Sequence, residues 1–114
     1  MYKTLKEGQE LINSLQRDLY DVDDIEIVVC PPYTLLIYLA DMLESSNIGL
    51  GAQDLHWEEE GAYTGEISAN MLKDAGCEYV IIGHSERRQF FGETNETVNK
   101  KVFAALKNDL TPIV

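Results

Sequence analysis

Four short apolar runs recur along the chain with a helical pattern between each pair, and this alternation limits the possible folds more than any other feature. The runs start near residues 25, 48, 79 and 111, and β-branched residues dominate the first and third. Such runs are typical of buried strands. Strands that alternate with helices predict βαβ units with right-handed crossovers. The fold class is therefore α/β, with about four parallel strands alternating with helices.

Local signals place the elements. Thr4 and Glu7 match a capping box, and apolar residues at helical spacing extend a first helix to about residue 20. Gly76 suits the C′ position of a helix. The expected strands cover residues 25–30, 48–53, 79–82 and 111–114, with a polar turn over 21–24, a polar loop over 54–66 and one helical turn over 86–91. Three further helices are expected: one capped by Thr34, one over residues 68–75, and one from Thr94 or Asn95 to about residue 108. The apolar face of the last helix consists of Val98, Val102, Ala105 and Leu106.

The small residues of the second strand carry a further expectation. Gly49 and Gly51 alternate with larger apolar residues in that strand. Glycine inside a strand is typical of a crowded barrel interior or of a close approach by another part of the backbone. We therefore expect either a crowded barrel interior or a close backbone approach at this strand.

Composition excludes several classes of protein. The chain has 114 residues, enough for one domain, and no apolar run approaches the roughly 18 residues of a membrane-spanning helix. Residues 1–4 do not resemble a signal peptide, and Cys30 and Cys77 are expected to be reduced, buried thiols. We therefore expect a cytoplasmic protein with no membrane partner.

The charge balance restricts the partners. The chain carries 9 basic and 20 acidic residues, a formal net charge of −11. Nucleic-acid binding needs a cationic face, so we expect no nucleic-acid partner. A phosphorylated substrate would need a locally positive site built from backbone N–H groups and one or two lysines. The acidic run at residues 58–60 is expected to be a solvated loop.

The two ends of the sequence indicate that residues 1–114 are part of a larger βα array. The chain opens on a helix with no strand before it and stops within a strand. Four parallel strands cannot close a barrel and leave two apolar edges. We expect residues 1–114 to be a single partial barrel domain, part of a βα array of about 250 residues, with a marginal fold in isolation.

The segment at residues 83–88, Gly-His-Ser-Glu-Arg-Arg, is the leading candidate for chemistry. It follows the third strand, and ligands bind at the carboxyl ends of strands in parallel sheets. His84 there suits a neutral imidazole that donates a hydrogen bond to a substrate carbonyl, with the positive end of the following turn disfavouring imidazolium. The alternative is a structural histidine. Glu86 and Arg87 either pair to orient the loop or form an ordinary surface pair.

Other motifs fail on inspection. Arg87 stands where a nucleophile elbow needs glycine, which excludes Ser85 as a nucleophile of that kind. Asp54 occupies the third glycine position of a dinucleotide fingerprint, and no phosphate loop is present. His56 and His84 lack metal-ligand spacing, so we expect no metal site. The sequon at Asn95 is better explained as a helix cap.

Several blocks in order resemble the triosephosphate isomerase family. These blocks are residues 30–32, 51–54, 61–68, 83–88 and 91–93, and the whole chain can be placed among the family's second to fifth strands. The resemblance implies a partial (β/α)8 TIM barrel. It also implies interconversion of dihydroxyacetone phosphate and glyceraldehyde 3-phosphate through an enediolate, in glycolysis and gluconeogenesis. It implies a small phosphorylated triose substrate, a homodimer or tetramer, and no metal or organic cofactor.

The resemblance also implies roles for individual residues. His84 is similar to the electrophile that polarises the substrate carbonyl and shuttles protons. Ser85 is similar to a serine that contacts the catalytic carboxylate, and Glu86 to the carboxylate that pairs with the active-site lysine. Thr64 resembles a loop tip that enters the neighbouring subunit, and Gln53 a residue near the lysine. Arg87 is expected to support the loop that carries His84.

The family's remaining catalytic groups fall outside residues 1–114. Its lysine belongs to a segment placed before Met1, and its proton-abstracting glutamate, phosphate loops and lid are placed after Val114. We therefore expect the chain alone to be inactive. The alternative function is a non-catalytic interaction module that docks onto a full-length subunit. A different sugar-phosphate enzyme on the same barrel is a weaker alternative, disfavoured by the segment at 83–88 together with the Thr64 loop.

Overall fold

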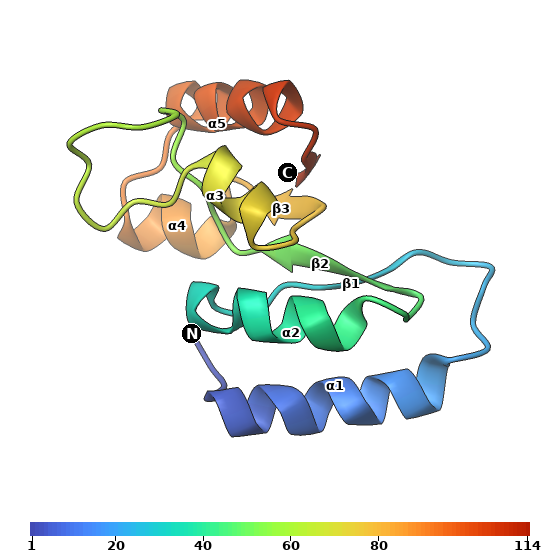
Figure 1. The fold of residues 1–114 in the computed structure, drawn as a ribbon. Coiled ribbons are helices and arrows are strands. Elements are labelled where there is room, and N and C mark those ends of the chain that lie inside the picture. The colour runs from blue at the N-terminus through green and yellow to red at the C-terminus, as the bar shows by residue number, and fades with distance from the viewer.

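The four expected strands form one parallel sheet in the order β1-β2-β3-β4 (Figure 1). The computed structural model describes residues 1–114. The strands are β1 (Ile27–Val29), β2 (Ile48–Ala52), β3 (Tyr79–Ile81) and β4 (Thr111–Ile113). All three neighbouring pairs are parallel. The α/β prediction with parallel strands alternating with helices is therefore confirmed.

The connections are helical, as the alternation predicts. The helices are α1 (Leu5–Leu19), the 3-10 helix η1 (Tyr33–Leu35), α2 (Leu36–Leu43), α3 (Ala69–Asp74), α4 (Ser85–Phe90) and α5 (Asn95–Lys107). Helix α1 packs on α2, α2 packs on β2, and α5 packs against β4. Figure 1 shows α1 as an outer layer below α2, and α5 on the opposite side of the molecule. No helix combines the length and the apolar character that a membrane crossing requires.

Three of the predicted helix signals are present. The Glu7 carboxylate accepts a hydrogen bond from the Thr4 backbone N–H at 2.7 Å, which is half of the reciprocal capping pattern. The Thr94 hydroxyl accepts from the Thr97 backbone N–H at 3.3 Å, so Thr94 rather than Asn95 is the N-cap of α5. Gly76 follows the C-cap of α3 with φ +88°, the left-handed conformation that glycine adopts readily.

The start of the second helix differs from the prediction. Thr34 does not cap it. The chain instead forms η1, closed by a hydrogen bond from Leu35 N–H to the Pro32 carbonyl, and Leu35 is the N-cap of α2 without a side-chain bond. Pro32 has an extended conformation, and the chain enters a tight turn at the residue that follows it. The first strand is also shorter than residues 25–30, because Ile25 is exposed.

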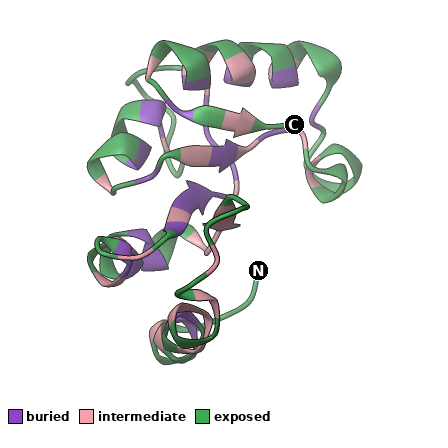
Figure 2. Cartoon of the chain, turned by 90° about the vertical axis from the view of Figure 1, so that its right-hand side faces the viewer, coloured by how far each residue is buried: buried purple, intermediate pink, exposed green.

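One apolar core lies between the sheet and the helices. Its 17 buried residues include Ile48, Leu50 and Ala52 of β2 and Val80 of β3, which are at most 4% exposed. These β2 residues alternate along the strand, so they share the face that the helices cover. Figure 2 shows buried residues concentrated on the strands and on the helix surfaces that face them.

The opposite face of β2 is covered closely, mainly by side chains rather than by backbone. A Cβ atom at Gly49 would lie 2.9 Å from Cε2 of Tyr79. A Cβ atom at Gly51 would lie 2.8 Å from Sγ of Cys30 and 3.1 Å from Cβ of Tyr79. The Tyr79 side chain crosses β2, and its hydroxyl hydrogen-bonds to the Glu26 carboxylate. Gly51 therefore leaves no room for a Cβ atom, whereas the nearest neighbour of Gly49 is the end of the Tyr79 ring.

Four charged side chains form a buried charge cluster, which we define as Asp54, Arg87, Glu93 and Lys101. Lys101 Nζ lies 2.7 Å from Asp54 Oδ1 and also pairs with Glu93. Arg87 Nε lies 2.9 Å from Asp54 Oδ2 and 3.4 Å from Glu93 Oε1. Two cations and two carboxylates balance, which offsets part of the cost of burying charge.

The cluster corrects two predictions. The loop over 54–66 is not polar and solvated throughout, because Asp54, Leu55 and His56 at its start are buried. Leu106 does not belong to the buried face of α5, since it is 55% exposed, and Lys101 is buried there instead. The prediction assigned α5 by apolar character alone, whereas ion pairing allows lysine to be buried.

Both cysteines are free thiols, as expected. Cys77 is buried, and burial raises the pKa of its thiol to about 11. Cys30 is only half-buried, so the expectation that both thiols are fully buried holds for Cys77 alone.

Replacing Gly51 with alanine should destabilise the fold by about 1–3 kcal/mol, because the new methyl group overlaps Cys30 Sγ and Tyr79 Cβ, which have little freedom to move. Gly49→Ala is the matched control, since its methyl group meets the end of the Tyr79 ring, which can swing away. Urea unfolding of both variants measures the difference. Equal costs at the two positions would contradict this account of the sheet.

Replacing Lys101 with methionine should lower the free energy of unfolding at pH 7 by about 3–5 kcal/mol, because it leaves two buried carboxylates with one cation. Lys6→Met, at a side chain that is 87% exposed, should change it by less than about 0.5 kcal/mol. Urea unfolding gives both values.

The loss in Lys101→Met should also shrink as the pH falls. Burial already raises the pKa of Asp54, while Lys101 and Arg87 oppose that shift. Without Lys101 the folded pKa rises further above the unfolded value, so the folded variant binds more protons and gains stability as the pH falls through that folded pKa. A deficit that stays constant between pH 7 and pH 4 would count against buried carboxylates as its cause.

Candidate active site

His84 lies at the carboxyl end of β3, where it caps the short helix α4. Gly83 precedes it with φ +72°, so the chain turns sharply between strand and helix. The Glu86 backbone N–H donates to His84 Nδ1 at 3.2 Å. A ring nitrogen that accepts a hydrogen bond carries no proton, so the imidazole is neutral with its proton on Nε2. His84 is therefore arranged as a hydrogen-bond donor through Nε2.

The Glu86 carboxylate lies near the ring but does not form an ion pair with it. Its Oε2 atom is 3.7 Å from His84 Nδ1, which is the nitrogen that already accepts a hydrogen bond. The Glu86 side chain is 73% exposed and is free to bind another cation. Ser85 begins α4 on the exposed side of the turn.

An open cavity of about 320 Å³ joins four of the six predicted site residues. His84, Glu86, Arg87 and Gln53 line it. The other lining residues are Met1, Tyr33, Asp54, Ile81 and Phe91. This volume is at the lower end of the range typical of small-molecule sites. The cavity collects residues from the carboxyl ends of β1, β2 and β3, which is where parallel sheets bind ligands.

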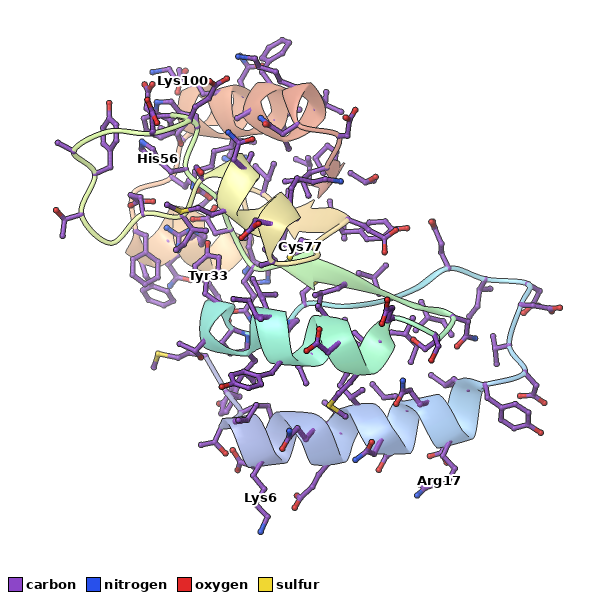
Figure 3. All side chains as sticks on the ribbon, viewed as in Figure 1. Lys6, Arg17, Tyr33, His56, Cys77 and Lys100 are labelled. Atoms are coloured by element: carbon purple, nitrogen blue, oxygen red, sulfur yellow. The ribbon has the colours of Figure 1, made fainter.

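The ends of β1 and β2 are joined by two hydrogen bonds at this cavity. Gln53 Nε2 donates to the Cys30 carbonyl at 2.9 Å. Tyr33 Oη donates to the Asp54 carbonyl at 2.5 Å, and burial together with the Asp54 charge raises the pKa of Tyr33. Figure 3 shows Tyr33 between the start of α2 and α4. The sequence analysis did not single out Tyr33, although its position directly after Pro32 is a strand-end signal.

Arg87 does not pair with Glu86, so both predicted arrangements of this pair, the one that orients the loop and the ordinary surface pair, are wrong. Its guanidinium binds Asp54 and Glu93 of the buried charge cluster, and it lies 4.9 Å over the Phe91 ring. Neighbours in a helix point to different sides, so Glu86 and Arg87 diverge. The sequence analysis missed Asp54 and Glu93 as partners because they lie 33 and 6 positions away in the chain.

Thr64 lies apart from the cavity, on the loop between β2 and α3 that projects from the molecule (Figure 1). The base of this loop is ordered around His56, whose ring stacks on Trp57 at 4.2 Å and on Tyr63 at 4.6 Å between centroids. His56 Nδ1 lies 3.6 Å from Glu66 Oε2. The loop therefore presents Thr64 to solvent from a packed base.

Metal coordination has no candidate among these side chains. No group of three or more His, Cys, Asp or Glu residues is arranged to hold a metal ion. The chemistry that the cavity offers is hydrogen bonding from a neutral imidazole, next to an exposed carboxylate.

Comparison with known proteins identifies the family of the chain. The family described as triosephosphate isomerase matches residues 1–114. Proteins named triosephosphate isomerase from Alkaliphilus oremlandii and Citrifermentans bemidjiense are 57% and 58% identical over 114 residues. The alignments cover the whole of this chain and 46% and 45% of those relatives.

A solved structure extends the similarity to three dimensions. The crystal structure of triosephosphate isomerase from Bartonella henselae superposes with a TM-score of 0.90 at 41% identity, over 98% of this chain and 46% of that one. The chain thus spans about half the length of the curated relatives that it matches. With a family match over its full length and this agreement in fold, the chain belongs to the triosephosphate isomerase family.

Proposed function

We propose that this chain supplies the electrophilic part of a triosephosphate isomerase active site, for the interconversion of dihydroxyacetone phosphate and glyceraldehyde 3-phosphate. The observation that carries the proposal is His84, a neutral imidazole at a strand end with Nδ1 occupied by the Glu86 N–H. Membership of the family supports the choice of a triose phosphate as substrate. Glycolysis and gluconeogenesis are the pathways that follow from it, and the cytoplasm is the proposed location.

In the proposed mechanism, a carboxylate base removes a proton from the carbon next to the substrate carbonyl. His84 Nε2–H donates to the carbonyl oxygen, which stabilises the negative charge that develops on it in the enediolate. The imidazole then gives its proton to one oxygen and takes the proton of the other, and the protonated base returns its proton to the neighbouring carbon, so that the ring and the base both regain their starting states. Glu86 orients a lysine next to this oxygen, and Ser85 contacts the base.

The base and the lysine belong, in this proposal, to segments of the family that this chain does not match. The alignments cover 46% of the Alkaliphilus oremlandii relative, which leaves room for both groups elsewhere. We propose that residues 1–114 form one partial barrel domain and have no isomerase activity alone. Exposed Thr64 on its projecting loop suits contact with a second subunit, and we propose a homodimer or a tetramer.

A chimera tests the proposal. Residues 1–114 replace the matching 46% of the Alkaliphilus oremlandii relative, and isomerase activity of the product is measured. The chimera should turn over triose phosphate, and His84→Gln should lower its kcat by about 10²–10⁴-fold, the usual contribution of general acid–base catalysis. His56→Gln, at the other histidine, is the matched control and should leave the chemistry unaffected.

Two results would count against the proposal. A folded His84→Gln chimera with undiminished kcat would exclude His84 as the electrophile. Turnover by the purified 114-residue protein that His84→Ala abolishes would show that residues 1–114 need no further groups.

A further inference from the structure

Arg87 is at the centre of the turn that holds His84. The Arg87 backbone N–H donates to the His84 carbonyl at 2.9 Å, and the Arg87 carbonyl accepts from Phe91 at 3.0 Å and from Glu93 at 3.3 Å. The Glu86 N–H that binds His84 Nδ1 lies between these bonds, in the first turn of α4. Any movement of Arg87 therefore moves the donor that sets the state of the imidazole.

Asp54 is the acceptor that ties Arg87 to the sheet. It lies two residues after the last residue of β2, Ala52, and is 5% exposed. Its Oδ2 atom accepts from Arg87 Nε at 2.9 Å, and its Oδ1 atom from Lys101 Nζ at 2.7 Å. Its carbonyl accepts from Tyr33 Oη at 2.5 Å. Asp54 is thus held by three separate elements and is a rigid point.

No side chain of α4 other than Arg87 forms a hydrogen bond or ion pair with a residue outside residues 83–95. Arg88 binds the Gly83 carbonyl and Asn95, and Glu86 contacts His84. Arg87 also approaches Glu93 at 3.4 Å, but Glu93 belongs to the segment that follows α4 and is bonded to it. The partners of Arg88 and Glu86 lie within residues 83–95, whereas Glu93 is itself paired with Lys101 of α5. The bond from Arg87 to Asp54 is the direct side-chain bond between α4 and the residues that follow β2, and the Glu93–Lys101 pair supports it.

We propose that Asp54 is a positioning residue for His84. Asp54 holds Arg87 in place, and Arg87 in turn holds the Glu86 N–H against His84 Nδ1. The donor proton of the imidazole therefore stays on Nε2. Asp54 does not touch the substrate in this arrangement. The consequence for catalysis rests on the proposed function, whereas the effect on the imidazole does not.

The test is Asp54→Asn in the 114-residue protein. Asparagine has the same shape but one acceptor oxygen, so it serves either Lys101 or Arg87. Nitrogen-15 NMR at pH 8 reports which ring nitrogen of His84 carries the proton. We expect Nδ1 to be unprotonated in the wild-type protein and a mixture of both tautomers in the variant. Hydrogen exchange of the Glu86 amide should rise by at least about tenfold, the effect expected from loss of one charge-assisted hydrogen bond.

Leu43→Ala separates positioning from general stability. Leu43 is a buried core residue at the end of α2 and takes no part in the ion pairs of the cluster, so its truncation lowers the stability and should leave the His84 tautomer unchanged. An unchanged tautomer and amide exchange in a folded Asp54→Asn protein would overturn the proposal. The same shift in Leu43→Ala would overturn it too, because any destabilisation would then suffice.

A second variant covers a failure of Asp54→Asn to fold. Arg87 is more exposed than Asp54, and Arg87→Lys keeps the charge while it removes the Nε donor. It should shift the tautomer in the same direction, and no shift would overturn the proposal. If both variants unfold while Leu43→Ala folds, the cluster serves the fold and the proposal is also overturned.

In the chimera, Asp54→Asn should lower kcat by at least about tenfold and leave KM within about twofold, since the donor is misplaced in the transition state and substrate binding is not. A rise in KM with unchanged kcat would overturn the catalytic part. If His84→Gln leaves the chimera's kcat unchanged, the proposed function fails, while the NMR experiment still decides whether Asp54 positions His84.

Discussion

The bond between the Asp54 carboxylate and its two cations is the interaction on which the arrangement of the molecule depends. Asp54 stands at the end of β2, Arg87 in α4 and Lys101 in α5. Apolar packing positions a helix against a sheet with some freedom to slide, because the hydrophobic effect has no direction. Charge-assisted hydrogen bonds depend on both direction and distance, so they fix the position of each helix against the sheet. The buried charge cluster thus sets the positions of α4 and α5 relative to the end of β2, and these positions define the site.

The sequence predicted those parts of the structure that depend on local chemistry. Alternating apolar and helical patterns gave the four parallel strands and their order of connection, and caps such as Thr4 and Thr94 gave the starts of two helices. The position of His84 at a strand end followed from the same pattern. Each of these features is decided by residues within a few positions of one another, which is the range over which a single sequence is informative.

The errors have three causes: a partner far away in the chain, a local turn that competes with a helix cap, and a backbone group that side-chain patterns do not report. Lys101 was not expected in the core because its acceptors, Asp54 and Glu93, lie 47 and 8 positions away. Thr34 was expected to cap a helix because hydroxyl residues usually do, but the backbone leaving Pro32 required a 3-10 turn first. The Glu86 N–H that sets the His84 tautomer is a backbone group, which side-chain patterns do not reveal.

The two glycines of β2 have a consequence for how such a protein can diversify. On the face that Tyr79 crosses, Gly49 and Gly51 offer no side chain to exchange, and any addition meets a neighbour at 2.9 Å or less. Mutation at Gly51 therefore has almost no neutral path toward new contacts on that face, and at Gly49 a change requires the Tyr79 ring to move. Evolutionary change in what the molecule recognises falls on the strand-end loops, where Gln53 and His84 stand, while the strand beneath them stays constant.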